Sequence, residues 1–470
     1  MGIKMKQKIN PLLKASIYYI FGNGIGQGVI LLGTVIFTRI MSQKDYGLYS
    51  TYYSVVSILT TLVGANLFIG LNNAYIDYKR DIYNVRASLL VLSMVVFSVI
   101  SVGAILLKSA VGWDISQFML IMALLHAYSF FLVNYFNNSA NMENKYRIKT
   151  VFMLLPNILQ IVLSVLFIWL FPRVALNARI SGSVMGVGVC ALCVTLYMLK
   201  GQRCFFNKEY WIYALKISVP SVLSSISYML MQQSDKIMIT SFYSAEETAI
   251  YALIYNVGYI LYAVLQATNG VWQVWIYRAL DNQKTENVKK IQKWYLLVFV
   301  QMAFGLLMVS PEIVKILAPE AYWKFEYIAP FILGSCLMVM YTFYTTVGLF
   351  YKKAGKVSLC VFIAAVVNIV LNCIFIPCFG GVAAAYTSVF SYIVLFFGVR
   401  RVVQKINRDL FSMKYFVLFF GAVAAGCMLF EMVYEKIILR YGAYMILLLL
   451  SMVYMLANKK EIVALVRGKE

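Results

Sequence analysis

The sequence predicts an all-α protein that crosses a lipid bilayer many times, and three observations carry this prediction. Of its 470 residues, 62% are hydrophobic and only 13% are charged, whereas a soluble domain carries roughly 25% charged residues. The apolar residues fall into runs of about 20, the length of helix that crosses about 30 Å of hydrocarbon. Short polar connections separate the runs, so we expect about fourteen transmembrane helices.

The expected helices follow one another along the whole chain. Their apolar runs cover residues 15–38, 46–74, 87–107, 115–136, 150–171, 180–199, 213–240, 248–276, 294–309, 327–351, 357–377, 381–399, 415–434 and 441–457. The second and eighth runs exceed one span, so we expect them to tilt or to extend into interfacial helix. The first run is too long for the apolar core of a signal peptide and leads into further spans.

Lysine and arginine alternate between rich and poor connections along the chain. Rich connections include 79–86, 352–356 and 400–414, whereas the alternate connections carry few cations. The positive-inside rule places the rich side in the cytoplasm. We therefore expect an even number of helices, both termini in the cytoplasm, and a net charge of +22 that reflects topology rather than nucleic-acid binding.

A weak internal repeat relates the two halves of the chain. The segment Arg39-Ile-Met near the end of the first run resembles Lys236-Ile-Met in the seventh. Asn157-Ile-Leu-Gln160 in the fifth run resembles Asn368-Ile-Val-Leu-Asn372 in the eleventh. Six helices separate each pair, an even spacing that preserves orientation and predicts a parallel repeat. The alternative is that apolar helices simply look alike.

The repeat predicts two pseudo-symmetric six-helix bundles followed by two additional helices. We expect residues 1–199 to form the N-terminal bundle and residues 200–400 the C-terminal bundle. Residues 401–470 then contain helices 13 and 14 and a cytoplasmic tail. No connection is long enough for an extramembrane domain, so the function resides within the bilayer.

Uncharged polar and charged residues inside the apolar runs are the candidate substrate-cavity residues. Polar side chains prefer the protein interior to lipid, so they mark either a hydrated cavity or hydrogen bonds between helices. Several recur on one helix face. The candidates are Asn23, Gln27, Thr34 and Arg39 in the first run, Asn66, Asn72 and Asn73 in the second, Ser218, Ser221, Ser225, Gln232, Asp235 and Lys236 in the seventh, and Gln266, Asn269 and Gln273 in the eighth.

Four ionisable residues carry more specific hypotheses. Arg39 and Lys236 end corresponding helices and could attract an anionic headgroup such as a diphosphate. Alternatively, both could extend to the interface, or Lys236 could pair with Asp235. Asp235 and His126 are the ion-coupling candidates, although a hydrogen-bonded interior histidine is the alternative for His126.

Enzymatic chemistry finds no support in the residue pattern. The sequence contains no paired carboxylates, no metal-ligand constellation and no nucleophile–base pair, so we expect no catalytic residue, metal or cofactor. The eight cysteines form no CxxC pair and mostly lie in apolar runs, where thiols act as apolar fillers. The glycine-rich segment 22–28 follows no strand, which excludes a nucleotide loop.

Three segments resemble Wzx-type polysaccharide flippases, which move O-antigen or capsule repeat units, of the multidrug/oligosaccharidyl-lipid/polysaccharide exporter superfamily. They are Arg39-Ile-Met-Ser-Gln-Lys-Asp-Tyr-Gly-Leu-Tyr, Ile217-Ser-Val-Pro-Ser with Ser234-Asp-Lys-Ile-Met-Ile, and Asn368-Ile-Val-Leu-Asn followed by Cys-Ile-Phe-Ile-Pro377-Cys-Phe-Gly-Gly. The resemblance implies two six-helix bundles around a central cavity, with helices 13 and 14 added.

The resemblance also implies a function. Such a protein, in the bacterial cytoplasmic membrane, would flip undecaprenyl-diphosphate-linked oligosaccharide repeat units to the outer leaflet by alternating access. Its expected partners are this lipid-linked oligosaccharide and the lipid bilayer, with a polysaccharide polymerase and assembly proteins as further candidates. The alternatives are a cation-coupled drug antiporter of the same superfamily, which needs buried acids, and a membrane polysaccharide polymerase, which needs a catalytic loop. A scaffolding role is less consistent with the polar stripes.

Overall fold

The computed structural model describes residues 11–111, 116–202, 204–282 and 285–461. Within these ranges the chain forms fourteen α-helices and three short 3-10 helices, with no strand. The all-α prediction is therefore confirmed. The chain divides into two compact units, residues 1–241 (unit 1) and 242–470 (unit 2). This division rests on compactness and does not test the predicted boundaries at 199/200 and 400/401, which stay a prediction.

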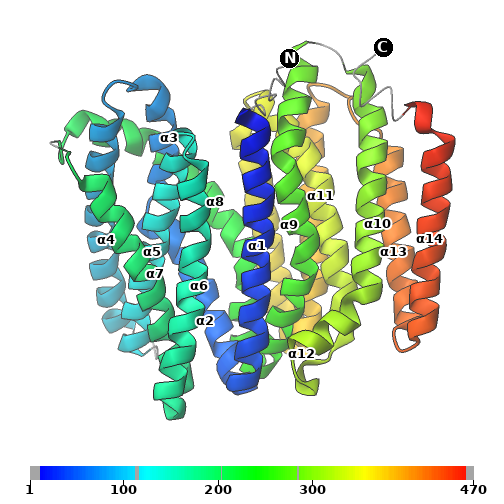
Figure 1. The fold of residues 1–470 in the computed structure, drawn as a ribbon, viewed down its shortest axis with the longest axis horizontal. Coiled ribbons are helices and arrows are strands. Elements are labelled where there is room, and N and C mark those ends of the chain that lie inside the picture. Colours follow the sequence, from blue (N-terminus) through cyan, green and yellow to red (C-terminus); the bar gives the residue numbers. More distant parts are fainter. Residues whose placement is uncertain (1–10, 112–115, 203, 283–284, 462–470) are drawn as a thin grey trace, which may run out of the picture. The chain divides into compact units, whose positions relative to one another are not determined.

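Unit 1 contains the blue to green helices of Figure 1. They are α1 (Pro11–Ile40), α2 (Gln43–Val63), α3 (Leu67–Asp77), α4 (Ile82–Val111), α5 (Gln117–Met142), α6 (Tyr146–Leu170), η1 (Pro172–Val174), α7 (Ala175–Leu199) and α8 (Lys208–Phe242). Unit 2 begins at Phe242, the last residue of α8.

Unit 2 contains the remaining helices, and Figure 1 shows α13 and α14 beside α10. They are α9 (Ala245–Asp281), α10 (Glu286–Leu317), η2 (Glu320–Tyr322), η3 (Phe325–Tyr327), α11 (Ile328–Phe350), α12 (Ala354–Gln404), α13 (Met413–Val433) and α14 (Ile437–Ala457). Large apolar side chains such as Ile438 (87% exposed) and Met432 (77% exposed) cover the outside of α13 and α14. Lipid, not water, suits such a surface.

Among the described residues, eleven helices are long and apolar enough to cross a membrane. The count becomes twelve when α2 and α3, which meet at a 40° bend, are taken as one broken span. A multi-pass membrane protein is therefore established. The predicted number of fourteen requires α1 and both halves of α12 to be counted as separate spans, and it stays a prediction.

The long helix α12 is in fact a helical hairpin. It contains 51 residues, and its backbone leaves the helical region at Gly380, where φ is 65° and ψ is −153°. Asn368 Nδ2 donates to Ser388 Oγ at 3.1 Å, and Asn372 accepts from Thr387. These contacts join the two halves in antiparallel register. Glycine adopts this left-handed φ at little cost, which explains how the runs 357–377 and 381–399 can turn back on each other.

A second hairpin, α6–α7, depends on close backbone contact. A Cβ atom on Gly182 would lie 2.5 Å from Ser164 Cα, and one on Gly186 would lie 2.5 Å from the Gln160 nitrogen. Small residues four positions apart on α7 therefore allow the two helices to meet backbone to backbone.

Helices α2 and α9 begin with the same capping arrangement, which agrees with the predicted repeat. Ser42 Oγ accepts from the Asp45 backbone N–H at 3.1 Å, and Ser244 Oγ accepts from the Glu247 N–H at 3.1 Å. A serine at this position satisfies one of the unbonded N–H groups at a helix start. Each of these helices follows one that carries the Arg39 or Lys236 segment near its end.

Candidate functional site

A break in one transmembrane span organises the polar residues of unit 1. Helix α2 ends at Val63 and α3 begins at Leu67, and between them Ala65 and Asn66 have φ angles of 43° and 50°. A break of this kind leaves backbone N–H and C=O groups without helical partners. In hydrocarbon such groups need other partners, so the break requires polar neighbours.

Helix α8 supplies these neighbours. Asn66 Nδ2 donates to Ser225 Oγ at 2.8 Å and to the Ser221 carbonyl oxygen at 3.3 Å. One turn further along α3, the Gly70 N–H donates to Ser218 Oγ at 3.1 Å. Asn66 is only 3% exposed and Ser218 is fully buried. The start of α3 is therefore held to α8 by the side chains of Ser218 and Ser225 and by the backbone carbonyl of Ser221.

The same pairing of helices continues along α2. Ser54 Oγ donates to Gln233 Oε1 at 3.0 Å, and the hydroxyls of Thr51 and Thr240 lie 2.5 Å apart. Lys236 Nζ also donates to Gln233 Oε1, at 3.3 Å.

We call this set of contacts the α2–α8 ladder. It consists of Thr51, Ser54, Asn66, Gly70, Ser218, Ser221, Ser225, Gln233 and Thr240. From Ser218 to Thr240 the ladder extends about 33 Å along α8 at 1.5 Å per residue, which is close to the thickness of the hydrocarbon core. Residues later in α2 and α3 contact residues earlier in α8 along the whole ladder, so α8 runs antiparallel to both helices.

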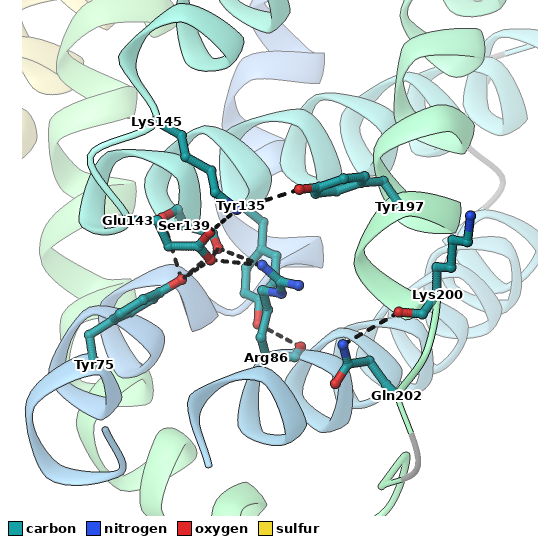
Figure 2. Close-up of polar contacts among 9 residues, drawn as sticks. All are labelled: Tyr75, Arg86, Tyr135, Ser139, Glu143, Lys145, Tyr197, Lys200 and Gln202. Carbon is teal, nitrogen blue, oxygen red and sulfur yellow. Dashed lines mark hydrogen bonds and ion pairs between the residues drawn. The ribbon is translucent and has the colours of Figure 1, made fainter. Parts of the chain in front are cut away.

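A charged cluster lies at the end of α5, outside the apolar spans. Figure 2 shows Tyr75, Arg86 and Ser139 converging on the Glu143 carboxylate. Arg86 Nη1 lies 2.9 Å from Glu143 Oε1, and the Tyr75 hydroxyl donates to the same oxygen at 2.8 Å. Lys145 Nζ lies 2.5 Å from Glu143 Oε2. One carboxylate therefore joins α3, α4 and the start of α6.

The ionisation of Glu143 follows from these partners. Burial by itself raises the pKa of the Glu143 carboxyl, but hydrogen bonds from Lys145 and Tyr75 and the charge of Arg86 outweigh it. The net result is a pKa below the usual value for glutamate. The hydrogen bond to Glu143 raises the pKa of Lys145. Both groups are charged near neutral pH.

Four of the predicted cavity residues come together in the ladder: Asn66, Ser218, Ser221 and Ser225. Gln232, Asp235 and Lys236 are buried on the same helix, α8, near its last turns. Lys236 and Asp235 also interact electrostatically. Helix α8 therefore carries the densest set of predicted site residues.

The candidates on α1 lie elsewhere. Gln27 is half-buried, and Thr34 is buried and donates to the Ile30 carbonyl of its own helix at 3.1 Å. Arg39 is exposed and donates to the Val35 carbonyl of the same helix at 2.9 Å. The side chain of Asn23 lies outside the described part of the structure.

The remaining candidates on α3 and α9 have other surroundings. Asn73 is exposed and donates to the carbonyl of Ile69, while Asn72 is half-buried. On α9, Gln266 donates to the Tyr262 hydroxyl at 2.6 Å and Gln273 to the Tyr277 hydroxyl at 3.1 Å. Asn269 is half-buried.

The surroundings of His126 favour the interior-histidine interpretation. The side chain is fully buried, Nδ1 lies 3.3 Å from the Tyr52 hydroxyl, and the imidazole stacks on Phe130 at 4.8 Å. Aromatic packing of this kind suits a neutral ring. Its role in ion coupling, and that of Asp235, stay predictions.

Sequence reasoning missed several functional candidates. Thr51, Ser54, Gln233 and Thr240 complete the ladder, and the serine and threonine hydroxyls within the second apolar run were a signal for it. Arg179 was also missed: its guanidinium lies 3.6 Å from the Tyr49 ring centroid, packed against α2.

The ladder is made of groups that can exchange hydrogen bonds with a ligand. Hydroxyl and amide groups both donate and accept, so they can bind sugar hydroxyls as well as one another. The described residues contain no group of three or more potential metal ligands. Long apolar helices define a multi-pass membrane protein, and the ladder joins two of them through polar groups.

Comparison with known proteins identifies the family. A family model described as "Polysaccharide biosynthesis protein" matches residues 12–273, more than half of the chain, and the chain belongs to this family. A Lsg locus protein of Haemophilus influenzae is 24% identical over 161 residues, which cover 33% of this chain and 40% of that relative. The match therefore spans less than half of the relative's length.

Solved structures show the fold. The chain is similar to the lipid II flippase MurJ in its inward closed conformation, with a TM-score of 0.67 and 14% identity over 95% of this chain and 100% of that one. It is also similar to an inward-facing multidrug resistance MATE transporter of the MOP superfamily, with a TM-score of 0.60 and 15% identity over 83% and 99% of the two chains. The family match shows a polysaccharide biosynthesis protein, as the resemblance implied, and the two solved structures show that the chain shares their fold.

Proposed function

We propose that this protein flips undecaprenyl-diphosphate-linked oligosaccharide repeat units across the cytoplasmic membrane by alternating access, for surface polysaccharide synthesis. The observation that carries the proposal is the family match over residues 12–273. The fold shared with a lipid II flippase supports a lipid-linked substrate. The protein acts as a transporter rather than an enzyme in this proposal.

The α2–α8 ladder supplies the chemistry that such a substrate needs. Moving a sugar headgroup through hydrocarbon requires polar groups in place of water, since each unpaired hydroxyl costs free energy there. Serine, threonine and amide side chains of the ladder exchange their mutual hydrogen bonds for bonds to the sugar. Lys236, buried beside the ladder, is the candidate partner of the diphosphate, with Arg39 as the second candidate.

The proposal also fixes orientation and partners. The lysine- and arginine-rich ends of the helices face the cytoplasm, so both termini are cytoplasmic. The polyprenyl tail remains in lipid while the headgroup crosses. A polysaccharide polymerase and assembly proteins would receive the flipped unit.

A cation-coupled drug antiporter is the second candidate. Similarity to a MATE transporter supports it, and the buried Asp235 is the acid that it would use. Proton- or sodium-driven efflux of cationic drugs that is lost in Asp235→Asn would favour this candidate.

Depletion of the protein in cells tests the leading proposal. Lipid-linked repeat units should accumulate in the inner leaflet and surface polysaccharide should disappear. Lys236→Ala should restore less polysaccharide than Lys216→Ala, a control on the exposed face of the same helix. Arg39→Ala has the exposed Lys44→Ala as its control. Normal surface polysaccharide in depleted cells would refute the proposal, and equal rescue by each variant and its control would refute the diphosphate assignment.

A further inference from the structure

One end of unit 2 carries a dense set of exposed cations. They lie where α9, α11, α12 and α14 end and where α10, α12 and α13 begin. These residues, which we call the basic end, are Arg278, Lys289, Lys290, Lys352, Lys353, Lys356, Arg401, Lys405, Arg408, Lys414, Lys459 and Lys460. Because successive helices run in opposite directions and α12 is a hairpin, all twelve lie at the same end.

Few acids compensate this charge. The exposed carboxylates at the same end, within the described ranges, are Asp281 and Asp409. The ion pairs found in the described structure include none of the twelve cations. The local surplus is therefore ten positive charges, twelve cations less two acids.

The other end of unit 2 has the opposite balance. Its exposed cations are Lys315, Lys324 and Lys436, and its exposed acids are Glu246, Glu320, Glu326, Glu431 and Glu435. Two cations of unit 1, Arg86 and Lys145, are used differently, because both are paired with Glu143 (Figure 2). The basic end of unit 2 thus presents its charge outward rather than using it to hold helices together.

The basic end directly adjoins the ends of the apolar helices. Helix α11 ends at Phe350 and α12 begins at Ala354, so the cations between them are within a few residues of the spans. Trp294 and Tyr454 pack together at the same end, with ring centroids 5.6 Å apart, and Lys293 lies 4.5 Å from the Trp294 centroid. Tryptophan and tyrosine concentrate at the membrane–water interface.

We propose that the basic end of unit 2 binds the headgroups of anionic phospholipids and so holds an anionic lipid shell around that unit. The position at the ends of the apolar helices favours lipid over a soluble partner, and a surplus of positive charge favours headgroups with a net negative charge over zwitterionic ones. This inference goes beyond the proposed transport function, and its test requires no transport.

Spin-labelled lipids measure the preference directly. The full chain is reconstituted in phosphatidylcholine vesicles that contain trace spin-labelled phosphatidylglycerol or phosphatidylcholine, and the protein-associated fractions are compared. We expect the protein to prefer phosphatidylglycerol severalfold at low salt. The preference should fall as added salt shortens the Debye length to about 8 Å at 0.15 M. Equal association of the two lipids, or a preference insensitive to salt, overturns the proposal.

Two variants with the same charge loss locate the effect. Lys289→Gln/Lys290→Gln removes two cations from the basic end, and Lys315→Gln/Lys436→Gln removes two from the other end. We expect the first to lower the preference at least twofold and the second by less than about a fifth. Equal effects overturn the assignment to the basic end.

A third arm separates two sources of phosphate. Trace spin-labelled polyprenyl diphosphate replaces the labelled phosphatidylglycerol in the same vesicles. If Lys289→Gln/Lys290→Gln weakens association of the diphosphate and leaves that of phosphatidylglycerol unchanged, the occupant is the diphosphate and the phospholipid proposal is wrong.

Discussion

Replacing Asn66 with alanine should destabilise unit 1 through two separate effects. The first is loss of the hydrogen bond to Ser225 at 2.8 Å, and hydrogen bonds between transmembrane helices contribute about 0.6 kcal/mol on average and up to about 1.7. The second is backbone strain, because φ at this position is 50°, and a left-handed residue with a Cβ costs roughly 1 kcal/mol where asparagine is better tolerated. We expect a total loss of about 2 kcal/mol in the free energy of unfolding.

A set of variants separates the two effects. Asn66→Gly loses the hydrogen bond without the strain, so its loss should be about 1 kcal/mol. Asn73→Ala is the matched control, since Asn73 lies on the exposed face of the same α3 helix and bonds only within it. Ser225→Ala, combined with Asn66→Ala, should give a coupling energy of about 0.6–1.7 kcal/mol.

Unfolding in mixed detergent micelles, followed by tryptophan fluorescence, measures these differences. The reasoning is refuted if Asn66→Ala and Asn73→Ala unfold at the same denaturant concentration. An additive double variant with Ser225→Ala would show that the contact between α3 and α8 carries no energy. If Asn66→Ala and Asn66→Gly lower the free energy of unfolding equally, the strain argument is contradicted. The hydrogen-bond argument would not be affected by that result.

Three further predictions concern packing and charge. Gly182→Ala should destabilise the α6–α7 hairpin by about 1–3 kcal/mol, because the new Cβ atom would lie 2.5 Å from the backbone of α6. Gly188→Ala is the control. Its Cβ atom would have its nearest neighbour at 3.9 Å, so this variant should melt like the parent protein. Glu143→Gln should cost about 3 kcal/mol, because it leaves a buried arginine unpaired. Since the pKa of Glu143 is lowered in the folded protein, its contribution is complete above the ordinary carboxyl pKa of about 4.3 and is lost only as pH falls further. The stability gap to Glu143→Gln should therefore stay constant between about pH 6 and 8 and close in strong acid; a gap that changes between pH 6 and 8 would contradict this. Arg440→Met should loosen α14 from α10, seen as faster hydrogen exchange in α14 only, because Arg440 is 1% exposed and pairs with a carboxylate on α10.

The apolar runs could be predicted well because hydrocarbon imposes one simple requirement on every span. The pair 357–377 and 381–399 was predicted as two helices, and the structure joins them as halves of a hairpin at Gly380. The signal was present in the sequence as Pro377 and the adjacent Gly380–Gly381, which favour a turn. Residues 46–74, by contrast, were expected to form a run longer than one span that tilts or extends into interfacial helix.

The α2–α3 break could not be predicted from composition. Positive φ angles at Ala65 and Asn66 leave little trace in a sequence, because alanine normally favours a helix. The break depends on tertiary contacts instead. Phe131 packs so closely on Gly64 that a Cβ there would lie 1.9 Å from its ring. Such a contact can be recognised only when the packing of α5 on α2 is known.

The candidate site could be predicted only in part, because its local pattern is visible in the sequence but its contacts between helices are not. Helical periodicity indicated that Ser218, Ser221 and Ser225 share one face of α8, which is a local property. Their partners on α2 and α3 depend on which helices are neighbours, and a polar stripe contains no information about that. The Glu143 cluster shows the same limit, because it brings Tyr75 to Glu143 across 68 positions of the sequence.

Reconstituted transport tests the central claim most directly. Purified protein is inserted into phosphatidylcholine–phosphatidylglycerol vesicles that carry a fluorescent undecaprenyl-diphosphate-linked oligosaccharide in both leaflets, and a membrane-impermeant quencher reports the accessible fraction over time. We predict that the protected inner-leaflet pool becomes accessible in vesicles that contain the protein, and more slowly with Lys236→Ala than with Lys216→Ala. Protection equal to that of protein-free vesicles, with the protein shown to be folded, would contradict the account.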